Sequence, residues 1–285
     1  MCMLRFLPEP VKTAIRSGIS AFAPEKVTLR GSVVYLNPDD AMLSGLMALG
    51  MYERREVEFF SKYCKPGMTV VDVGANVGAF SALALRQSAP GGRVVSIEPH
   101  PESRKFLTRT VEANLNPTVS ADIIPMAAAA AEGETQLFLN PNNKADNRLF
   151  QSEETPEAIT VQLRTIDAIL ADLGVSQIDF LKTDAQGADF EALKGARETL
   201  ERSPKMVILS EFWPEGIATV SGEPARNYLE YLNGLGFALY TLGAGAAMEP
   251  LGADDYDALS GSLTGTDYVN IAAFKGWDGD PRSAN

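Results

Sequence analysis

Two acidic residues and a short glycine-containing segment have the spacing of a nucleoside-binding site. Asp72 ends an apolar run, Gly74 and Gly78 follow it, and Glu98 ends the next apolar run, 24 residues after Gly74. Gly74 can adopt positive φ and leaves room for a ligand, and Gly78 permits close packing of a helix on a strand. A carboxylate at the position of Glu98 can accept both hydroxyl groups of a ribose. The pattern therefore predicts a site for a dinucleotide or for S-adenosylmethionine.

The residues within the turn separate these two cofactors by charge. A dinucleotide places its pyrophosphate on bare backbone amides beside a small residue, whereas this turn has Asn76 at its middle and Asp72 just before it. S-adenosylmethionine carries an ammonium and a sulfonium, and both gain Coulomb energy from a nearby carboxylate. The turn therefore favours an S-adenosylmethionine-dependent methyltransferase. Two alternatives remain, a nicotinamide-dependent oxidoreductase and a non-catalytic module that keeps the cofactor pocket.

Asp184 and Glu211, which end two later apolar runs, are the candidate catalytic residues. A hydroxyl group that accepts a methyl group must lose its proton, and a positioned carboxylate can take it. We predict that Asp184 is this base or orients the acceptor, that Glu211 also orients the acceptor, and that Lys182 pairs with a carboxylate. As alternatives, Asp184 caps the following helix, or it holds a divalent cation together with Glu211. No metal site is predicted, because a third ligand is not evident.

Alternating strands and helices must position these residues. Apolar, β-branched runs alternate with helical patterns, which predicts an α/β fold with a mostly parallel sheet and helices on both faces. Ligands bind such sheets beyond the carboxyl ends of the strands, where all four acidic residues fall. The last two strands lack a long helix between them, and an antiparallel pair at the sheet edge is expected. The predicted strands are residues 68–73, 93–97, 120–126, 178–183, 206–212, 237–242 and 268–274, with one helix at about 188–202.

The charge distribution divides the chain at residue 65. Residues 1–65 carry a net charge of +2 and residues 66–285 a net charge of −14. We predict an α-rich N-terminal cap over residues 1–65 and a Rossmann-like domain over residues 66–285. Residues 1–22 lack the continuous apolar region of a signal peptide. Residues 11–22 are expected to form a surface helix, with a peripheral amphipathic membrane helix as the alternative.

Composition excludes several other classes of protein. The 285 residues are 45% hydrophobic and 22% charged, an ordinary globular balance. A net charge of −12 argues against a nucleic-acid partner, since phosphates are held by Lys and Arg. Cys2, Cys64 and the single His100 cannot build a zinc cluster, and so few cysteines suggest a reducing compartment. No run approaches the roughly 20 apolar residues of a membrane span, so we expect a cytoplasmic protein without an integral membrane segment.

Several longer motifs resemble those of the FkbM-type family of S-adenosylmethionine-dependent methyltransferases, over roughly residues 50–212. They are the segments 70–78 (VVDVGANVG), 96–101 (SIEPHP), 182–189 (KTDAQGAD) and 193–196 (LKGA), together with Tyr52 and Glu53. The resemblance implies a seven-stranded Rossmann-like sheet of the class I methyltransferase type and S-adenosylmethionine as cofactor. It also implies a small-molecule acceptor, such as a sugar or secondary-metabolite hydroxyl that is O-methylated. Gln186 and Asp189 stand where Glu is usual in this family.

The predicted cofactor-binding set combines these motifs with the glycine turn. It consists of Glu53, Asp72, Gly74, Ala75, Asn76, Gly78, Glu98, Pro99, Ala127 and Asp184. His100 is expected to face solvent or to lie near the adenine rather than to act as a base. Trp213 stacks on a ring of the acceptor or closes the core. The polar loop 140–148 recognises a polyhydroxylated acceptor or is a plain solvated loop.

Overall fold

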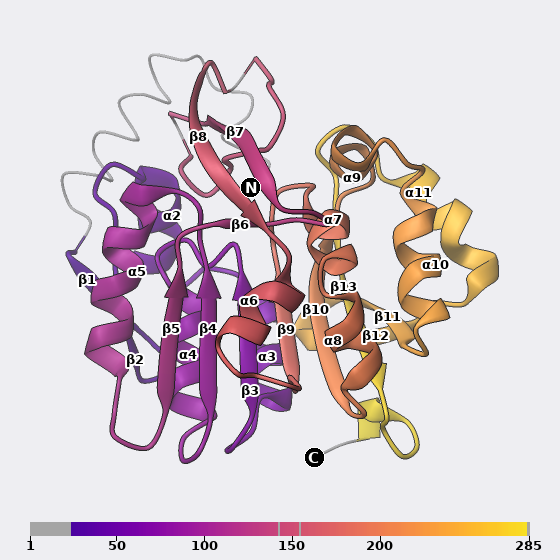
Figure 1. Cartoon of the computed structure of the whole chain (residues 1–285), viewed down its shortest axis with the longest axis horizontal. Coiled ribbons are helices and arrows are strands. Elements are labelled where there is room, and N and C mark those ends of the chain that lie inside the picture. The colour runs from indigo at the N-terminus through magenta and orange to yellow at the C-terminus, as the bar shows by residue number, and fades with distance from the viewer. Residues whose placement is uncertain (1–23, 142, 154, 284–285) are drawn as a thin grey trace.

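The computed structural model describes residues 24–141, 143–153 and 155–283. The expectations for residues 1–22 lie outside this part of the chain. An eight-stranded sheet runs through the molecule in the order β12-β11-β13-β10-β9-β3-β4-β5 (Figure 1). Its strands are β3 (Thr69–Val73), β4 (Arg93–Ile97), β5 (Ser120–Ile124), β9 (Phe180–Thr183), β10 (Met206–Phe212), β11 (Ala238–Leu242), β12 (Met248–Pro250) and β13 (Val269–Lys275).

The sheet is mostly parallel, which confirms the predicted fold class. The five strands β10, β9, β3, β4 and β5 run parallel to one another. Strand β13 is antiparallel to both β10 and β11, so the expected antiparallel pair of final strands is present, with β13 inserted beside β10. The short strand β12 pairs with β11 and adds an eighth strand to the expected seven.

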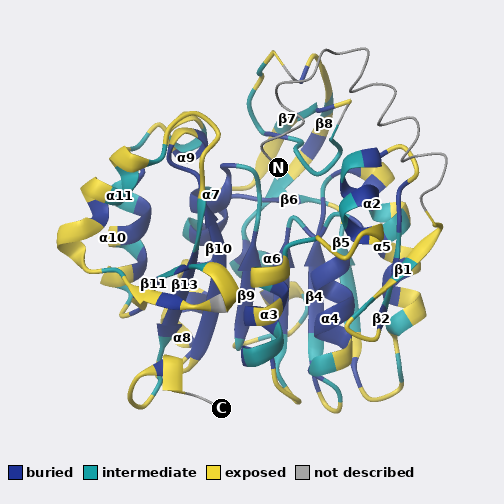
Figure 2. Cartoon of the chain, turned by 180° about the vertical axis from the view of Figure 1, so that it is seen from behind, coloured by how far each residue is buried: buried dark blue, intermediate teal, exposed yellow. Residues whose placement is uncertain are grey.

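Helices cover both faces of the sheet because side chains alternate along each strand. On one face, Val70 and Val94 pack with α3 (Arg54–Tyr63), α4 (Ala79–Gln87) and α5 (Pro101–Asn114). The opposite face packs against a second set of helices, and Figure 2 shows the strands buried between the two layers. This second set is α6 (Ile166–Asp172), α7 (Asp189–Lys194), α8 (Arg197–Arg202), α9 (Pro214–Ser221), α10 (Arg226–Gly234) and α11 (Tyr256–Ser262).

The single helix expected at about 188–202 is wrong, because the chain forms the two short helices α7 and α8 there. Gly195 separates them, and a Cβ atom at this position would collide with the Ala129 carbonyl oxygen. The Gly195 carbonyl also accepts a hydrogen bond from the Asp167 backbone amide, at 2.9 Å. Close backbone approach at this glycine therefore interrupts a helical sequence pattern.

A small second sheet stands beyond the carboxyl ends of the main strands (Figure 1). Its strands β6 (Ala127–Ala128), β7 (Gly133–Leu139) and β8 (Glu157–Arg164) lie in the order β6-β8-β7, and β7 and β8 are antiparallel. The polar loop 140–148 follows β7, as the sequence indicates. This sheet places the loop over the edge where the acidic residues are expected.

Residues 24–65 contain a hairpin as well as helices. Strands β1 (Lys26–Leu29) and β2 (Ser32–Tyr35) pair antiparallel, and α2 (Ala41–Ala48) and α3 follow them. Side chains of β2 and α2 form a small core with α4, whereas α3 packs directly on the main sheet. A domain boundary at residue 65 stays a prediction. In the described part of the chain, no helix is long and apolar enough to cross a membrane.

Candidate functional site

Strand register gathers the acidic residues on one face of the sheet, at its carboxyl edge. Asp72 on β3 lies opposite Lys182 on β9, and Ser210 on β10 lies opposite Thr183. Because side chains alternate, Asp72, Lys182 and Asp184 face the α3–α4 side, while Thr183 faces the other side. Glu211 occupies the same side on β10, since its strand neighbours Val207 and Leu209 pack into the α3–α4 core. Four charged groups separated in sequence thus meet at one edge.

The glycine turn between β3 and α4 is shaped by close backbone contacts. Gly74 has φ 71°, and a Cβ atom on it would collide with the Asp184 carbonyl oxygen. Gly78 begins α4 with φ 88°, and a Cβ atom there would lie 2.7 Å from Leu107 Cδ1. Asn76 also adopts a left-handed conformation, φ 50°, which asparagine tolerates better than most residues. Both glycines are therefore required by packing as well as by turn geometry.

The backbone amides of this turn are already used within the protein. The amides of Gly74 and Ala75 donate to the Ile97 carbonyl at 3.0 and 3.1 Å, and the Asn76 amide donates to Glu98 Oε2 at 2.8 Å. A pyrophosphate bound at such a turn needs free amides. The arrangement is therefore unsuited to a dinucleotide and suited to a ligand that meets the Glu98 carboxylate.

Glu98 is held rigidly at the end of β4. Its Oε1 accepts a second backbone hydrogen bond, from the His100 amide at 2.8 Å, and its side chain is buried. Burial raises the pKa of Glu98 to about 7, against the two backbone amides, which lower it. Each carboxylate oxygen keeps one lone pair for a ligand hydroxyl. His100 is buried beside the Ser103 hydroxyl, so its expected solvent-facing position is wrong.

Asp72 and Lys182 are buried and interact with each other at the bottom of the site. Ser81 Oγ donates to Asp72 Oδ2 at 2.7 Å, and Lys182 Nζ lies 3.9 Å from Asp72 Oδ1 and 3.6 Å from Asp184 Oδ2. The Lys182 ammonium also lies 5.0 Å from the centre of the Phe80 ring. The expected pairing of Lys182 with a carboxylate is thus present. Burial raises the pKa of Asp72, while Lys182 and Ser81 oppose that shift.

Asp189, and not Asp184, organises the loop that begins α7. Its Oδ1 accepts from Thr183 Oγ1 at 2.6 Å and from the Ala185 amide at 3.1 Å, and its Oδ2 accepts from the Gly187 amide at 3.3 Å. The alternative that Asp184 caps this helix is therefore wrong. The Asp184 side chain is 26% exposed, and its Oδ1 accepts from Gln186 Nε2 at 2.8 Å. Asp184 is left facing the open side of the edge.

Glu53 and Glu211 are two further acidic groups that interact electrostatically with Asp184. Glu53 begins α3 with φ 34°, and burial raises its pKa to about 8, with Lys182 opposing this shift and Asp184 adding to it. Glu211 is only 8% exposed, and burial followed by the charge of Asp184 raises its pKa well above the ordinary value. Desolvation and like charges thus favour the protonated forms of both groups when no ligand is bound.

A cavity opens at this edge of the sheet, lined by residues that follow β3, β4 and β9. Eight residues of the predicted site line it: Glu53, Gly74, Ala75, Asn76, Glu98, Pro99, Ala127 and Asp184. Asp72 lies beneath the floor, Gly78 packs α4 on α5, and Glu211 lies beside Asp184 outside the lining. Among the described residues, no group of three or more His, Cys, Asp or Glu could hold a metal ion.

Several lining residues were not singled out by the sequence. Leu43 comes from α2 and Leu137 from β7, and Lys144, Asn147 and Leu149 come from the segment that follows β7. The polar composition of loop 140–148 was a signal for part of this set. Nothing in the local sequence points to Leu43, because its position depends on how α2 packs against α4.

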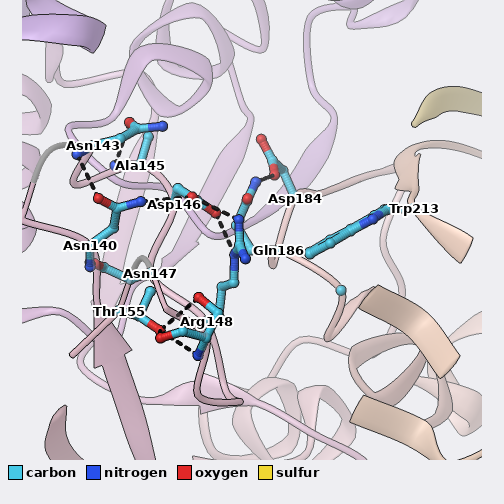
Figure 3. A network of polar contacts seen from close by, with 12 residues as sticks. Asn140, Asn143, Ala145, Asp146, Asn147, Arg148, Thr155, Asp184, Gln186 and Trp213 are labelled. Carbon is cyan, nitrogen blue, oxygen red and sulfur yellow. Dashed lines mark hydrogen bonds and ion pairs between the residues drawn. The ribbon is translucent and has the colours of Figure 1, made fainter. Parts of the chain in front are cut away.

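The described residues of this loop, 140–141 and 143–148, form hydrogen bonds with one another (Figure 3). Arg148 pairs with Asp146 through Nε–Oδ1 at 2.7 Å, and Asn140 Nδ2 donates to Asp146 Oδ2 at 2.9 Å. The Arg148 guanidinium also lies 5.0 Å from the Trp213 ring centre. Trp213 is 6% exposed and donates its indole N–H to the Gly265 carbonyl, at 2.6 Å. Lys144, Ala145 and Asn147 of this loop line the cavity, and Arg148 joins the loop to Trp213 outside the lining.

The fold and the site define the class of protein. The sheet is Rossmann-like and mostly parallel, with a glycine turn after β3 and an acidic residue after β4. Residues 72–239, more than half of the chain, match the family described as the methyltransferase FkbM domain. The chain belongs to the FkbM methyltransferase family.

Curated relatives match about half of the chain. The methyltransferase sdnD of Sordaria araneosa is 25% identical over 177 residues, which cover 52% of this chain and 68% of that protein. The AMB antimetabolite synthetase AmbE of Pseudomonas aeruginosa is 28% identical over 186 residues, 50% of this chain and 8% of AmbE. Ribosomal RNA large subunit methyltransferase E of Paracidovorax citrulli is 28% identical, over 50% of this chain and 56% of that protein. The chain thus spans only part of the last two relatives.

Two solved structures resemble the chain over most of its length. A methyltransferase FkbM from Methylobacillus flagellatus KT matches with a TM-score of 0.44 and 13% identity, covering 93% of this chain and 59% of that one. An O-methyltransferase from Bacillus cereus, in complex with SAH, matches with a TM-score of 0.43 and 15% identity, covering 95% and 93%.

Proposed function

We propose that this protein binds S-adenosylmethionine in the cavity and transfers its methyl group to a hydroxyl oxygen of a small-molecule acceptor. The observation that carries the proposal is the Glu98 carboxylate, which two backbone amides fix at the end of β4, beside a turn whose own amides are occupied. This arrangement offers acceptors to ribose hydroxyls, and the amides of Gly74, Ala75 and Asn76 are not free to bind a pyrophosphate. It therefore supports the methyl donor over a nicotinamide dinucleotide.

The charges around the cavity fit a cationic cofactor. Glu53, Glu98 and Asp184 line the cavity, and Asp72 lies directly beneath it. Asp72 Oδ1 is buried without a hydrogen-bond donor, and its nearest cation, Lys182, is 3.9 Å away. A ligand with an ammonium and a sulfonium gains from this negative potential. When bound, S-adenosylmethionine supplies an electrophilic methyl group on its sulfonium.

Each acidic residue has a separate part in the proposed reaction. Glu98 binds the ribose hydroxyls, and Glu53 and Asp72 stabilise the positive charge. Asp184 takes the proton of the acceptor hydroxyl on a carboxylate oxygen as the oxygen attacks, and Glu211 orients the acceptor. Lys182, 3.6 Å from Asp184 Oδ2, holds the carboxylate toward the cavity. Lys144, Ala145 and Asn147 of loop 140–148 cover one side of the cavity.

A small molecule is a better acceptor than RNA for this chain. The net charge is −12, and the groups around Asp184 are mainly carboxylates. Phosphate-rich acceptors would be repelled, because binding them requires clustered Lys and Arg. A sugar or secondary-metabolite hydroxyl meets no such obstacle.

Isothermal titration with S-adenosylmethionine and with NADH tests the cofactor. We expect saturable heat with the methyl donor or with S-adenosylhomocysteine, and none with NADH. No binding at millimolar S-adenosylmethionine, or binding of NADH in its place, contradicts the proposal. Cofactor binding without methylation of any compound in a broad hydroxyl-acceptor screen would instead favour the non-catalytic alternative.

A further inference from the structure

Glu211 lies on the far side of Asp184 from the ribose-binding carboxylate. The strand order β10-β9-β3-β4 places Glu211, Asp184, Asp72 and Glu98 at successive strand ends (Figure 1). The proposed cofactor half of the site lies at the ends of β3 and β4, and Asp184 lies next to it, at the end of β9. Glu211 on β10 is therefore one strand further on, where the acceptor must lie.

The carboxylates at this edge differ in their donors. Asp184 accepts from Gln186, Asp189 from the Thr183 hydroxyl and two amides, and Glu56 from Asn270 Nδ2 at 2.7 Å. Among the described residues, none donates a hydrogen bond to the Glu211 side chain; the residue is 8% exposed, and its carboxylate oxygens are not among the buried atoms without a partner, so they remain accessible. Its nearest cation is Lys182, which Asp72 and Asp184 already engage. An accessible carboxylate without a protein donor at the acceptor side can accept hydrogen bonds from a bound molecule.

The groups around Glu211 restrict the chemical class of ligand that could bind it. No group of three or more His, Cys, Asp or Glu among the described residues could hold a metal ion. The other acidic groups acting on Glu211 are Asp184, Asp189 and Glu53, so an anionic or acceptor-only ligand would be repelled. A cationic ligand with several N–H donors would both balance the negative charge around Glu211 and donate hydrogen bonds to its carboxylate oxygens.

We propose that the acceptor carries a protonated amine, which binds Glu211 while its hydroxyl group lies at Asp184. The inference rests on the proposed function and specifies the substrate class of that site as amino sugars or amino alcohols. Neighbouring strands are about 4.8 Å apart, so the two carboxylates suit an amine and a hydroxyl that are separated by two or three carbon atoms.

Matched probes test this inference on the full chain loaded with S-adenosylhomocysteine. Glucosamine, galactosamine and 2-aminocyclohexanol are compared with their N-acetyl forms, which keep the hydroxyl groups and lose the charge. We expect at least one amine to bind about tenfold or more tightly than its N-acetyl form, as a desolvated charge pair requires. The variant Glu211→Gln is expected to remove this preference and to keep the affinity for S-adenosylhomocysteine within about twofold.

Glu215→Gln is the matched control, because Glu215 is exposed on α9 and the substitution changes the net charge equally. It should leave the amine preference intact. Equal binding of amines and N-acetyl forms, no binding of any amine, or a preference that survives in Glu211→Gln overturns the inference. If S-adenosylhomocysteine itself does not bind, the proposed function is contradicted, and the inference, which rests on it, is overturned as well.

Discussion

The two halves of the site differ in how completely the protein satisfies its own polar groups. In the β3–β4 half, the turn amides of Gly74, Ala75 and Asn76 have protein acceptors, and both oxygens of Glu98 have backbone donors. In the β9–β10 half, Asp184 is partly exposed, and the buried Glu211 has no donor among the described residues. The first half thus fixes the turn and Glu98 but still leaves Asp72 Oδ1 and Asn76 Oδ1 buried without a partner, whereas the second half leaves the carboxylates of Asp184 and Glu211 accessible to a ligand.

This difference indicates that the β3–β4 half is the rigid one and that the β9–β10 half determines acceptor specificity. A pre-organised half binds a constant ligand without reorganisation, which suits a cofactor. The other half is bounded by loop 140–148 and by Trp213, and loops on a rigid scaffold are where substrate recognition varies. Family membership therefore says more about the first half than about the second.

The largest expected effect is that of Gly74→Ala, which disturbs the backbone of the cofactor half. The new Cβ atom collides with the Asp184 carbonyl and forces alanine into positive φ. We expect the free energy of unfolding to fall by about 4 kcal/mol and S-adenosylhomocysteine binding to be lost. Urea denaturation and calorimetric titration measure the two effects.

Gly174→Ala is the control for this prediction. Gly174 also has positive φ, 67°, but nothing lies within 4 Å of an added Cβ atom. Only backbone strain is then expected, about 1 kcal/mol, with normal cofactor affinity. Equal losses in the two variants would show that the contact between Gly74 and Asp184 is not what matters.

Asp184→Asn should separate the two halves functionally. The amide cannot take a proton from the acceptor, so we expect methyl transfer to fall by about 10²-fold or more. The affinity for S-adenosylhomocysteine should change by less than about threefold, because Glu98 and the turn are untouched. Transfer of labelled methyl groups and calorimetry measure these quantities. Unchanged turnover removes Asp184 from the role of base.

Ligand binding to the cofactor half should depend on pH through Glu98. Its pKa of about 7 means that the carboxylate gains its charge between pH 6 and pH 8. We expect the affinity for 5′-methylthioadenosine, which lacks the ionisable amino acid, to rise about tenfold over this range. Glu98→Gln should bind more weakly at pH 8 and show a flat profile. A flat profile for the unaltered protein contradicts the assignment of Glu98 to the ribose.

The stability of the free protein should show the opposite trend with pH. The pKa of Glu98 is higher in the folded state than its ordinary value of 4.5, so the folded protein keeps a proton that the unfolded chain releases. This contribution is fully present below pH 4.5 and is lost as the pH rises through about 7. Denaturant midpoints at pH 5 and pH 8 check the direction, and Glu98→Gln should reduce the difference.

The smallest expected effect is that of Ser81→Ala, beneath the cofactor half. The substitution removes the hydroxyl that donates to Asp72 Oδ2 at 2.7 Å, in a buried carboxylate whose Oδ1 already lacks a hydrogen-bond donor, and keeps the backbone amide of residue 81. We expect a loss of about 1.5 kcal/mol in unfolding free energy, with cofactor affinity lowered by less than tenfold. An unaltered unfolding midpoint would mean that Lys182 and the backbone amide of residue 81 suffice to compensate Asp72.

Local pattern accounted for much of the fold and for the cofactor half. The alternation of strands and helices predicted the parallel sheet, because apolar periodicity is set by each element separately. The turn from Gly74 to Gly78 and the carboxylate Glu98 were predicted because their roles depend on short spacings. The break at Gly195 was missed, since it arises from contact with Ala129, far away in the chain.

The sequence by itself determined the class of fold, the position of the glycine turn and the acidic character of the strand ends. Tertiary structure decided which carboxylates are satisfied. Only the folded structure shows that Asp189 accepts from the loop amides of Ala185 and Gly187, that Asp184 lines the cavity, and that no described residue donates to Glu211. The physical reason is that hydrogen bonding and burial depend on neighbours across strands, whereas periodicity and turn propensity depend on neighbours along the chain.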